Sequence, residues 1–202
     1  LLETIIKKPD VFLESLFRAA TCSADPKNCL PPQLKNIINA PPKGKVVVIG
    51  AGKAAGSMAN AFENFWLKSF PAIPLYGIVV TRYGHTLNCK HIDVIEAGHP
   101  LPDANGTSAA NKIFELARGL TKDDLAVCLI SGGCSALLSL PADGIELEEK
   151  RSLTQELLHS GATIHEMNCV RKHLSKIKGG KLAKAIYPAK VLTFCISDVP
   201  GD

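Results

Sequence analysis

The stretch that decides the fold is Lys45–Gly56, which reads KVVVIGAGKAAG. Its apolar run, Val46–Ile49, does not alternate with polar residues, and this indicates a strand buried on both faces of a sheet. Gly50 and Gly52 allow a tight turn and let a ligand approach the backbone. The small residues that follow begin a helix whose free N–H groups would suit an anion. The stretch matches the G-x-G-x-x-A pattern, with Lys53 placed where an anionic ligand would lie. The alternative is an ordinary strand–turn–helix with a solvated lysine.

Buried apolar runs recur along the rest of the chain and alternate with helical patterns. We expect further strands at 76–80, 91–96, 125–130 and 191–196, and helices at 10–20, 54–67, 103–116, 146–158, 164–174 and 182–186. The strand at 91–96 alternates and suits an edge position, and Asp103 is a candidate helix N-cap. Residues 22–32, rich in Pro, Asn and Asp, predict a loop. This order predicts an α/β protein: a Rossmann-like three-layer αβα sandwich with a mostly parallel sheet.

Composition and charge narrow the class of protein. At 202 residues, 46% of them hydrophobic, the chain is long enough for one good core. The net charge of +4 suits a small anionic ligand, and the chain has no basic block of the kind that follows a nucleic-acid backbone. No apolar run approaches the roughly 20 residues that span a membrane. The seven cysteines include no C-x-x-C pair, which predicts reduced thiols in an intracellular protein and gives a zinc site no support.

Three segments directly follow predicted strands: 50–53, 131–135 and 197–202. Because ligands bind beyond the carboxyl ends of parallel strands, we expect these segments to line one binding site at that end of the sheet. Lys53 supplies a charge that can follow a phosphoryl group through its transfer. Asp198 is placed to hold a metal, since a carboxylate is the usual protein ligand of Mg²⁺ beside phosphates. A turn-forming role for Asp198 is the alternative.

The remaining candidates for binding phosphate or substrate come from loops. In the segment SGGCS, Gly132 and Gly133 offer backbone N–H groups, while Ser131 and Ser135 add hydroxyl donors. The other candidates are His99, which could bond a substrate hydroxyl, and Arg171 and Lys178 in a basic segment that ends at a Gly-Gly break. For each, the alternative is structural: a Gly-rich turn, a histidine that fixes its own loop, or a solvated helix face.

Five motifs in order resemble the glycerate 2-kinases, also called type-2 or MOFRL-type glycerate kinases. They are GAGKAA at 50–55, GHPxPD at 98–103, SGGxSAL at 131–137, NxVRKHLSxIKGG at 168–180 and SDVPGD at 197–202. The resemblance implies ATP-dependent phosphorylation of D-glycerate to 2-phosphoglycerate with Mg²⁺. It also implies that Lys53 and Asp198 are active-site residues.

The resemblance covers about residues 45–202 and sets the expected domain organisation. Residues 1–44 would be an amino-terminal helical segment packed on the main domain, and 45–202 the amino-terminal domain of the kinase, without the family's carboxyl-terminal domain. The expected partner is D-glycerate, a homodimer is left open, and the expected location is the cytoplasm, with the mitochondrion as the alternative.

Two rival functions stay open at this point. One is an NADP-dependent hydroxypyruvate reductase, because the glycine pattern also suits a dinucleotide. At the end of the second strand Thr81-Arg82 replaces the acidic residue of an NAD site but would tolerate a 2′-phosphate. The other is a folded but non-catalytic fragment.

Overall fold

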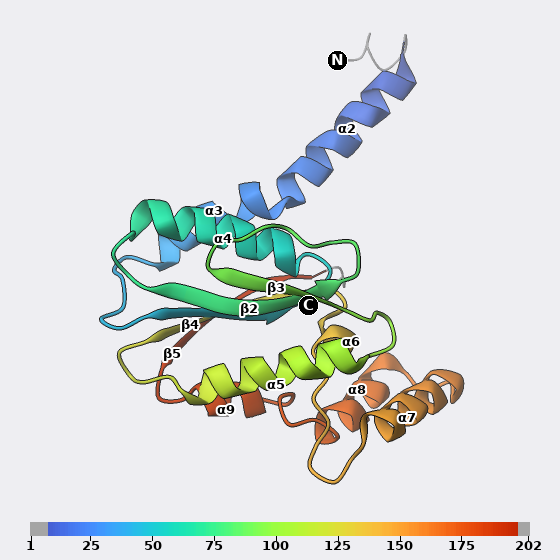
Figure 1. Ribbon diagram of the computed structural model, residues 1–202. Coiled ribbons are helices and arrows are strands. Elements are labelled where there is room, and N and C mark those ends of the chain that lie inside the picture. Colours follow the sequence, from blue (N-terminus) through green and yellow to red (C-terminus); the bar gives the residue numbers. More distant parts are fainter. Residues whose placement is uncertain (1–7, 198–202) are drawn as a thin grey trace.

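The computed structural model describes residues 8–197, and Figure 1 shows helices on both faces of one sheet. The sheet has five strands in the order β3-β2-β1-β4-β5, and every neighbouring pair is parallel. The strands are β1 (Val46–Ala51), β2 (Leu75–Arg82), β3 (Ile92–Ala97), β4 (Leu125–Ser131) and β5 (Lys190–Ile196). The predicted three-layer α/β fold is therefore confirmed, with 91–96 at an edge of the sheet.

The two sides of β1 explain why its apolar run does not alternate with polar residues. Val46 and Val48 pack in a cluster that includes Phe62, from α4 (Ala55–Ser69), and residues of α3 (Pro26–Ile37). Val47 and Ile49 lie in a second cluster, with residues of α5 (Ala104–Arg118) and α9 (Lys181–Ile186). Helices thus cover both faces, and a strand between two apolar layers needs apolar side chains at every position.

The predicted loop at 22–32 is wrong, because most of it is helical. Residues 22–24 end α2 (Pro9–Ala24), and α3 then begins after Asp25, whose carboxylate accepts a backbone N–H hydrogen bond. Pro26 stands in the first turn of α3, where proline is tolerated. Two further prolines lie inside the helix, and the buried side chains of Leu30 and Leu34 hold it against the core.

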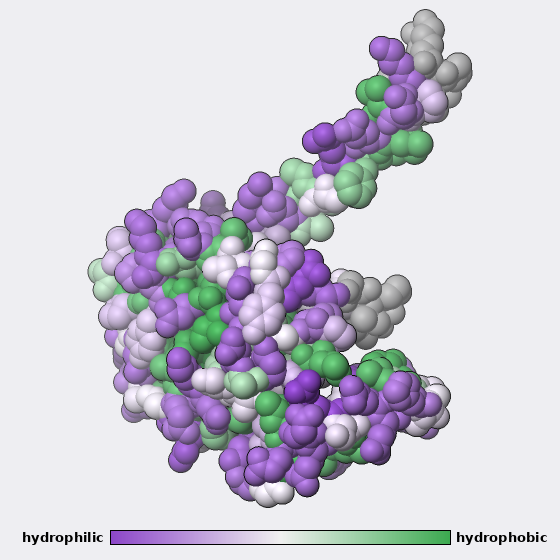
Figure 2. All heavy atoms as spheres, turned by 45° about the vertical axis from the view of Figure 1, so that its right-hand side comes forward, coloured by the Kyte–Doolittle hydropathy of each residue, from purple (hydrophilic) through white to green (hydrophobic). Residues whose placement is uncertain are grey.

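Only part of the amino-terminal segment packs on the main body. Helix α2 buries none of its residues and extends away from the sheet as an arm (Figures 1 and 2). Figure 2 shows apolar side chains on its surface, and Leu13 and Phe17 are among the exposed ones. Within residues 8–197, no helix is both long and apolar enough to cross a membrane.

Between β4 and β5 the chain builds a helical hairpin that stands beside the sheet (Figure 1). After α6 (Cys134–Leu137), helices α7 (Leu147–His159) and α8 (Ile164–His173) follow one another. Two backbone hydrogen bonds close the base of the hairpin, from the Lys176 N–H to the Leu140 carbonyl and from the Ala142 N–H to the Leu174 carbonyl, each at 3.1 Å. We call residues 142–174 the α7–α8 hairpin.

Candidate functional site

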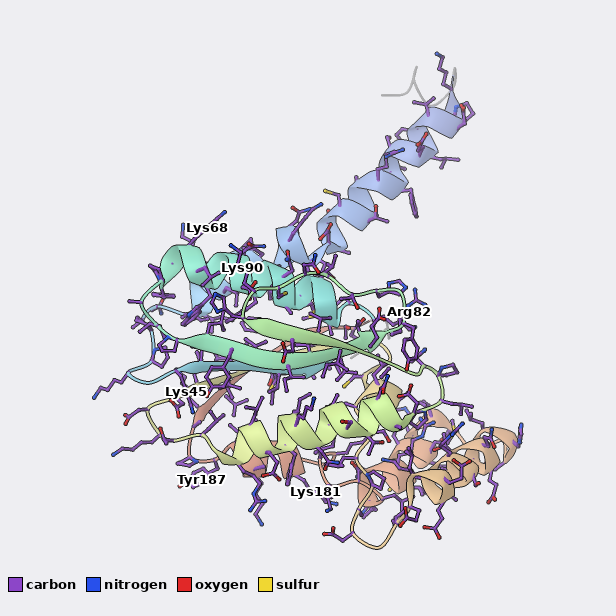
Figure 3. All side chains as sticks on the ribbon, in the orientation of Figure 1. Lys45, Lys68, Arg82, Lys90, Lys181 and Tyr187 are labelled. Atoms are coloured by element: carbon purple, nitrogen blue, oxygen red, sulfur yellow. The ribbon has the colours of Figure 1, made fainter. Side chains whose placement is uncertain are left out.

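The site lies where the strand order changes direction. β1 has β2 on one side and β4 on the other, and Ala51 at its end pairs with Ile130 near the end of β4. Such a switch point is where open parallel sheets bind ligands. Figure 3 labels Arg82 at this carboxyl end of the sheet and Lys45 at the opposite end.

Hydrogen bonds join the loops that follow β1 and β4. The Lys53 N–H donates to the Gly132 carbonyl at 2.8 Å, and the Ala54 N–H donates to the Ser131 hydroxyl at 3.0 Å. Two of the three predicted segments are therefore in direct contact, whereas residues 198–202 of the third, Asp198 among them, lie outside the described residues.

The expected free N–H groups after β1 are already used. Besides the two bonds above, the Gly52 N–H donates to the Val80 carbonyl and the Ala55 N–H to the Gly52 carbonyl, both at 3.0 Å. Four successive N–H groups thus have partners inside the protein, and an anion would have to displace those bonds to use them. What the loop presents at this end of the sheet is the exposed side chain of Lys53.

The glycines of the first loop have a packing role. Gly52 has φ 142°, and a Cβ there would collide with the Ser131 hydroxyl. Gly50 is buried inside β1, where a Cβ would collide with the Leu129 carbonyl of β4. Both residues allow the two strand ends to lie close together, which positions Lys53.

Gly133 is where the second loop meets the other candidate groups. A Cβ on Gly133, which has φ 88°, would lie 2.9 Å from His99 Nε2 and 3.4 Å from Lys53 Cγ. His99, Lys53 and Gly133 are therefore packed together at the carboxyl end of the sheet. Burial lowers the pKa of His99, and the positive charges of Lys53 and Arg82 lower it further. The imidazole is thus held neutral at pH 7 and can accept a hydrogen bond.

The loop that carries His99 is anchored at Asp103. This carboxylate caps α5 by accepting the Gly106 N–H at 2.9 Å, and it also accepts the Tyr83 hydroxyl at 2.7 Å. The predicted N-cap is confirmed. Burial opposes ionisation of Asp103, but these hydrogen bonds prevail and its pKa is lowered.

The structure places Ser135, Arg171 and Lys178 around a different cavity, at the base of the α7–α8 hairpin. Lys178 is partly buried and donates to the Leu138 carbonyl at 3.1 Å. The same cavity is lined by Lys150, which the sequence analysis missed. Nothing in the local sequence of α7 marks Lys150 as the lysine that turns inward.

A family model described as "Domain of unknown function (DUF4147)" matches residues 12–202. The chain belongs to this family. The matched residues include both strand-end loops and the α7–α8 hairpin.

A relative named as a glycerate kinase and a solved structure of one agree with the resemblance seen in the motifs. D-glycerate 2-kinase of Thermotoga maritima is 43% identical over 78% of this chain and 37% of its own length. The crystal structure of glycerate kinase from the same organism has a TM-score of 0.80 and 39% identity, over 94% of this chain and 46% of that chain. A protein of Agrobacterium vitis with the provisional name hydroxypyruvate reductase is 52% identical over 94% of this chain and 42% of its own. The resemblance to glycerate 2-kinases is thereby confirmed, and the DUF4147 chain spans less than half the length of each of these relatives.

Proposed function

We propose that the chain is the amino-terminal part of an enzyme that phosphorylates the 2-hydroxyl of D-glycerate with ATP, giving 2-phosphoglycerate. The observation that carries the proposal is the packing of Lys53, His99 and Gly133 at the β1/β4 switch point. The names of the relatives from Thermotoga maritima support the same reaction.

In this reaction the 2-hydroxyl oxygen bonds to the γ-phosphorus of ATP while the bond to the β–γ bridging oxygen breaks, and ADP and the proton of the hydroxyl are released. The exposed ammonium of Lys53 would neutralise the charge on the transferring group, which is the main electrostatic task in phosphoryl transfer. Neutral His99 would accept a hydrogen bond from the attacking hydroxyl and orient it. Gly132 and Gly133 would line the phosphate path beside them.

Mg²⁺ is expected from the resemblance. Residues 8–197 contain no group of three or more His, Cys, Asp or Glu side chains that could hold a metal ion. A Mg²⁺ ion beside nucleotide phosphates needs only one or two protein carboxylates, so a larger group of protein ligands is not required. Asp198, outside the described residues, keeps its proposed role of holding Mg²⁺ or orienting the nucleophile.

The geometry of the first loop argues against the reductase. A dinucleotide binds its pyrophosphate through the N–H groups that follow the first strand. Here the N–H groups of Lys53 and Ala54 donate to the second loop instead. The bulk of the Lys53 side chain also lies within the glycine pattern, where the backbone would have to approach the pyrophosphate. The kinase is therefore the better-supported function.

The test is the product formed by the purified protein that contains this chain. With ATP and D-glycerate we expect ³¹P NMR to show 2-phosphoglycerate and ADP in equal amounts. Oxidation of NADPH by hydroxypyruvate, without such a product, would contradict the proposal. The cytoplasmic location and the homodimer remain predictions, which fractionation and light scattering would test.

A further inference from the structure

The cavity at the base of the α7–α8 hairpin has a feature that ordinary packing does not explain. Three cationic side chains line it, Lys150, Arg171 and Lys178, and no carboxylate is among its described lining residues. Clustered cations repel one another, and burying them adds the loss of hydration. A negative group that joined these cations would relieve the repulsion and offset the lost hydration.

Of these three residues, Lys150 is the least exposed. Its side chain belongs to a residue only 6% exposed, and among residues 8–197 its ammonium has no hydrogen-bond partner. Burial lowers its pKa from 10.5 to about 8, and the charges of Lys178 and Arg171 add to the effect. Ser139, 1% exposed, also lines the cavity with a hydroxyl that has no partner in this part of the chain. Two buried polar groups are therefore directed at one small space.

The size and place of the cavity limit what could enter it. It holds about 20 Å³, enough for a water-sized group, so it accepts the end of a small acid and excludes a nucleotide. Its wall includes Ser135, in α6 just after the loop that follows β4, and Pro100, next to His99. The cavity therefore adjoins the cluster of Lys53, His99 and Gly133.

We propose that this cavity is an oxyanion subsite that holds the carboxylate of the 2-hydroxy acid substrate, with Lys150 as its buried counter-charge. The inference rests on the proposed function. In a 2-hydroxy acid the reacting hydroxyl is one carbon away from the carboxylate. An acid anchored by Lys150, Arg171 and Lys178 would thus present its hydroxyl toward the neighbouring His99 loop.

The experiment is steady-state kinetics of Lys150→Met, with Lys172→Met as a control that removes an exposed lysine of the same hairpin. We expect Lys150→Met to raise the KM for D-glycerate about 10- to 100-fold, the effect of losing a charge-assisted contact, and to leave the KM for ATP unchanged. An unchanged KM for D-glycerate would overturn the inference while leaving the kinase intact. A raised KM for ATP alone would assign the cavity to a phosphate and also overturn it.

Thermal unfolding gives a readout that does not depend on turnover. Because Lys150→Met removes an unpaired buried charge, the free variant should melt at a higher temperature than wild type. D-glycerate should raise the melting temperature of wild type and of Lys172→Met but not of Lys150→Met, and glycerol, which lacks the carboxylate, should raise none of them.

These results separate the two proposals. If the wild type makes no 2-phosphoglycerate but D-glycerate still stabilises it through Lys150, the proposed function fails and the subsite stands. If D-glycerate stabilises wild type and Lys150→Met equally, or neither, the subsite is contradicted whatever the activity.

Discussion

At the residue scale, the site depends on glycines, which have no side chain, as much as on the side chains of its other residues. Gly133 combines a left-handed backbone with contact to both His99 and Lys53, so any side chain there must displace one of them. From the sequence, Gly133 was a candidate because of its N–H group. The structure adds a steric reason, which depends on contacts between distant parts of the chain.

We expect Gly133→Ala to lower kcat/KM for D-glycerate by at least 10-fold, because the new methyl group lies 2.9 Å from His99 Nε2. The backbone strain alone should lower the free energy of unfolding by about 1–2 kcal/mol. Gly144→Ala is the matched control, since Gly144 has φ 80° and nothing within 4 Å of a Cβ. It should lose similar stability and keep its activity. Equal activity losses in the two variants would show that strain, not contact with His99, is responsible.

At the element scale, the sequence predicted every strand and most helices, because buried runs and helical spacing are local signals. The first part of helix α3, residues 26–32, was missed because its prolines and asparagine resemble a loop. The cap at Asp25 and the burial of Leu34 stabilise the helix there. The two helices of the hairpin were predicted. The position of Lys150 on their inner side was not predicted. That position depends on how α7 packs against the rest of the protein, and no local sequence pattern predicts this packing.

The cap of α5 allows a test at the same scale. Asp103→Ala should lower the free energy of unfolding by about 1 kcal/mol at pH 7, measured by urea denaturation. Since hydrogen bonds lower the pKa of Asp103 in the folded state, its contribution is present above its ordinary pKa of 3.8 and is lost as the pH falls through the lowered value. The difference from wild type should therefore shrink below about pH 4.

Asp93→Ala, at an exposed carboxylate of β3, is the control and should change stability little at either pH. If the loss in Asp103→Ala stayed constant down to pH 2, the carboxylate would not be the source of the stabilisation.

At the scale of the whole molecule, the groups that the proposed reaction requires lie together at the carboxyl ends of the strands. The loops after β1 and β4 meet, His99 lies against them, and the cationic cavity of the α7–α8 hairpin adjoins the same loops. The sequence predicted this shared binding site from strand ends alone. It could not separate the Lys53 cluster from the cavity of Lys150, Arg171 and Lys178, because that division depends on how the hairpin folds back on α6.

The central claim is that Lys53 acts on the transferring phosphoryl group, and the most direct measurement is the rate of 2-phosphoglycerate formation by Lys53→Met. We expect kcat to fall by about 10²–10³, the usual effect of removing one preorganised charge, with unchanged melting temperature because the side chain is exposed. Lys112→Met, at an exposed lysine of α5, should retain the wild-type rate. A Lys53→Met protein that phosphorylates D-glycerate at a near-normal rate would contradict the account.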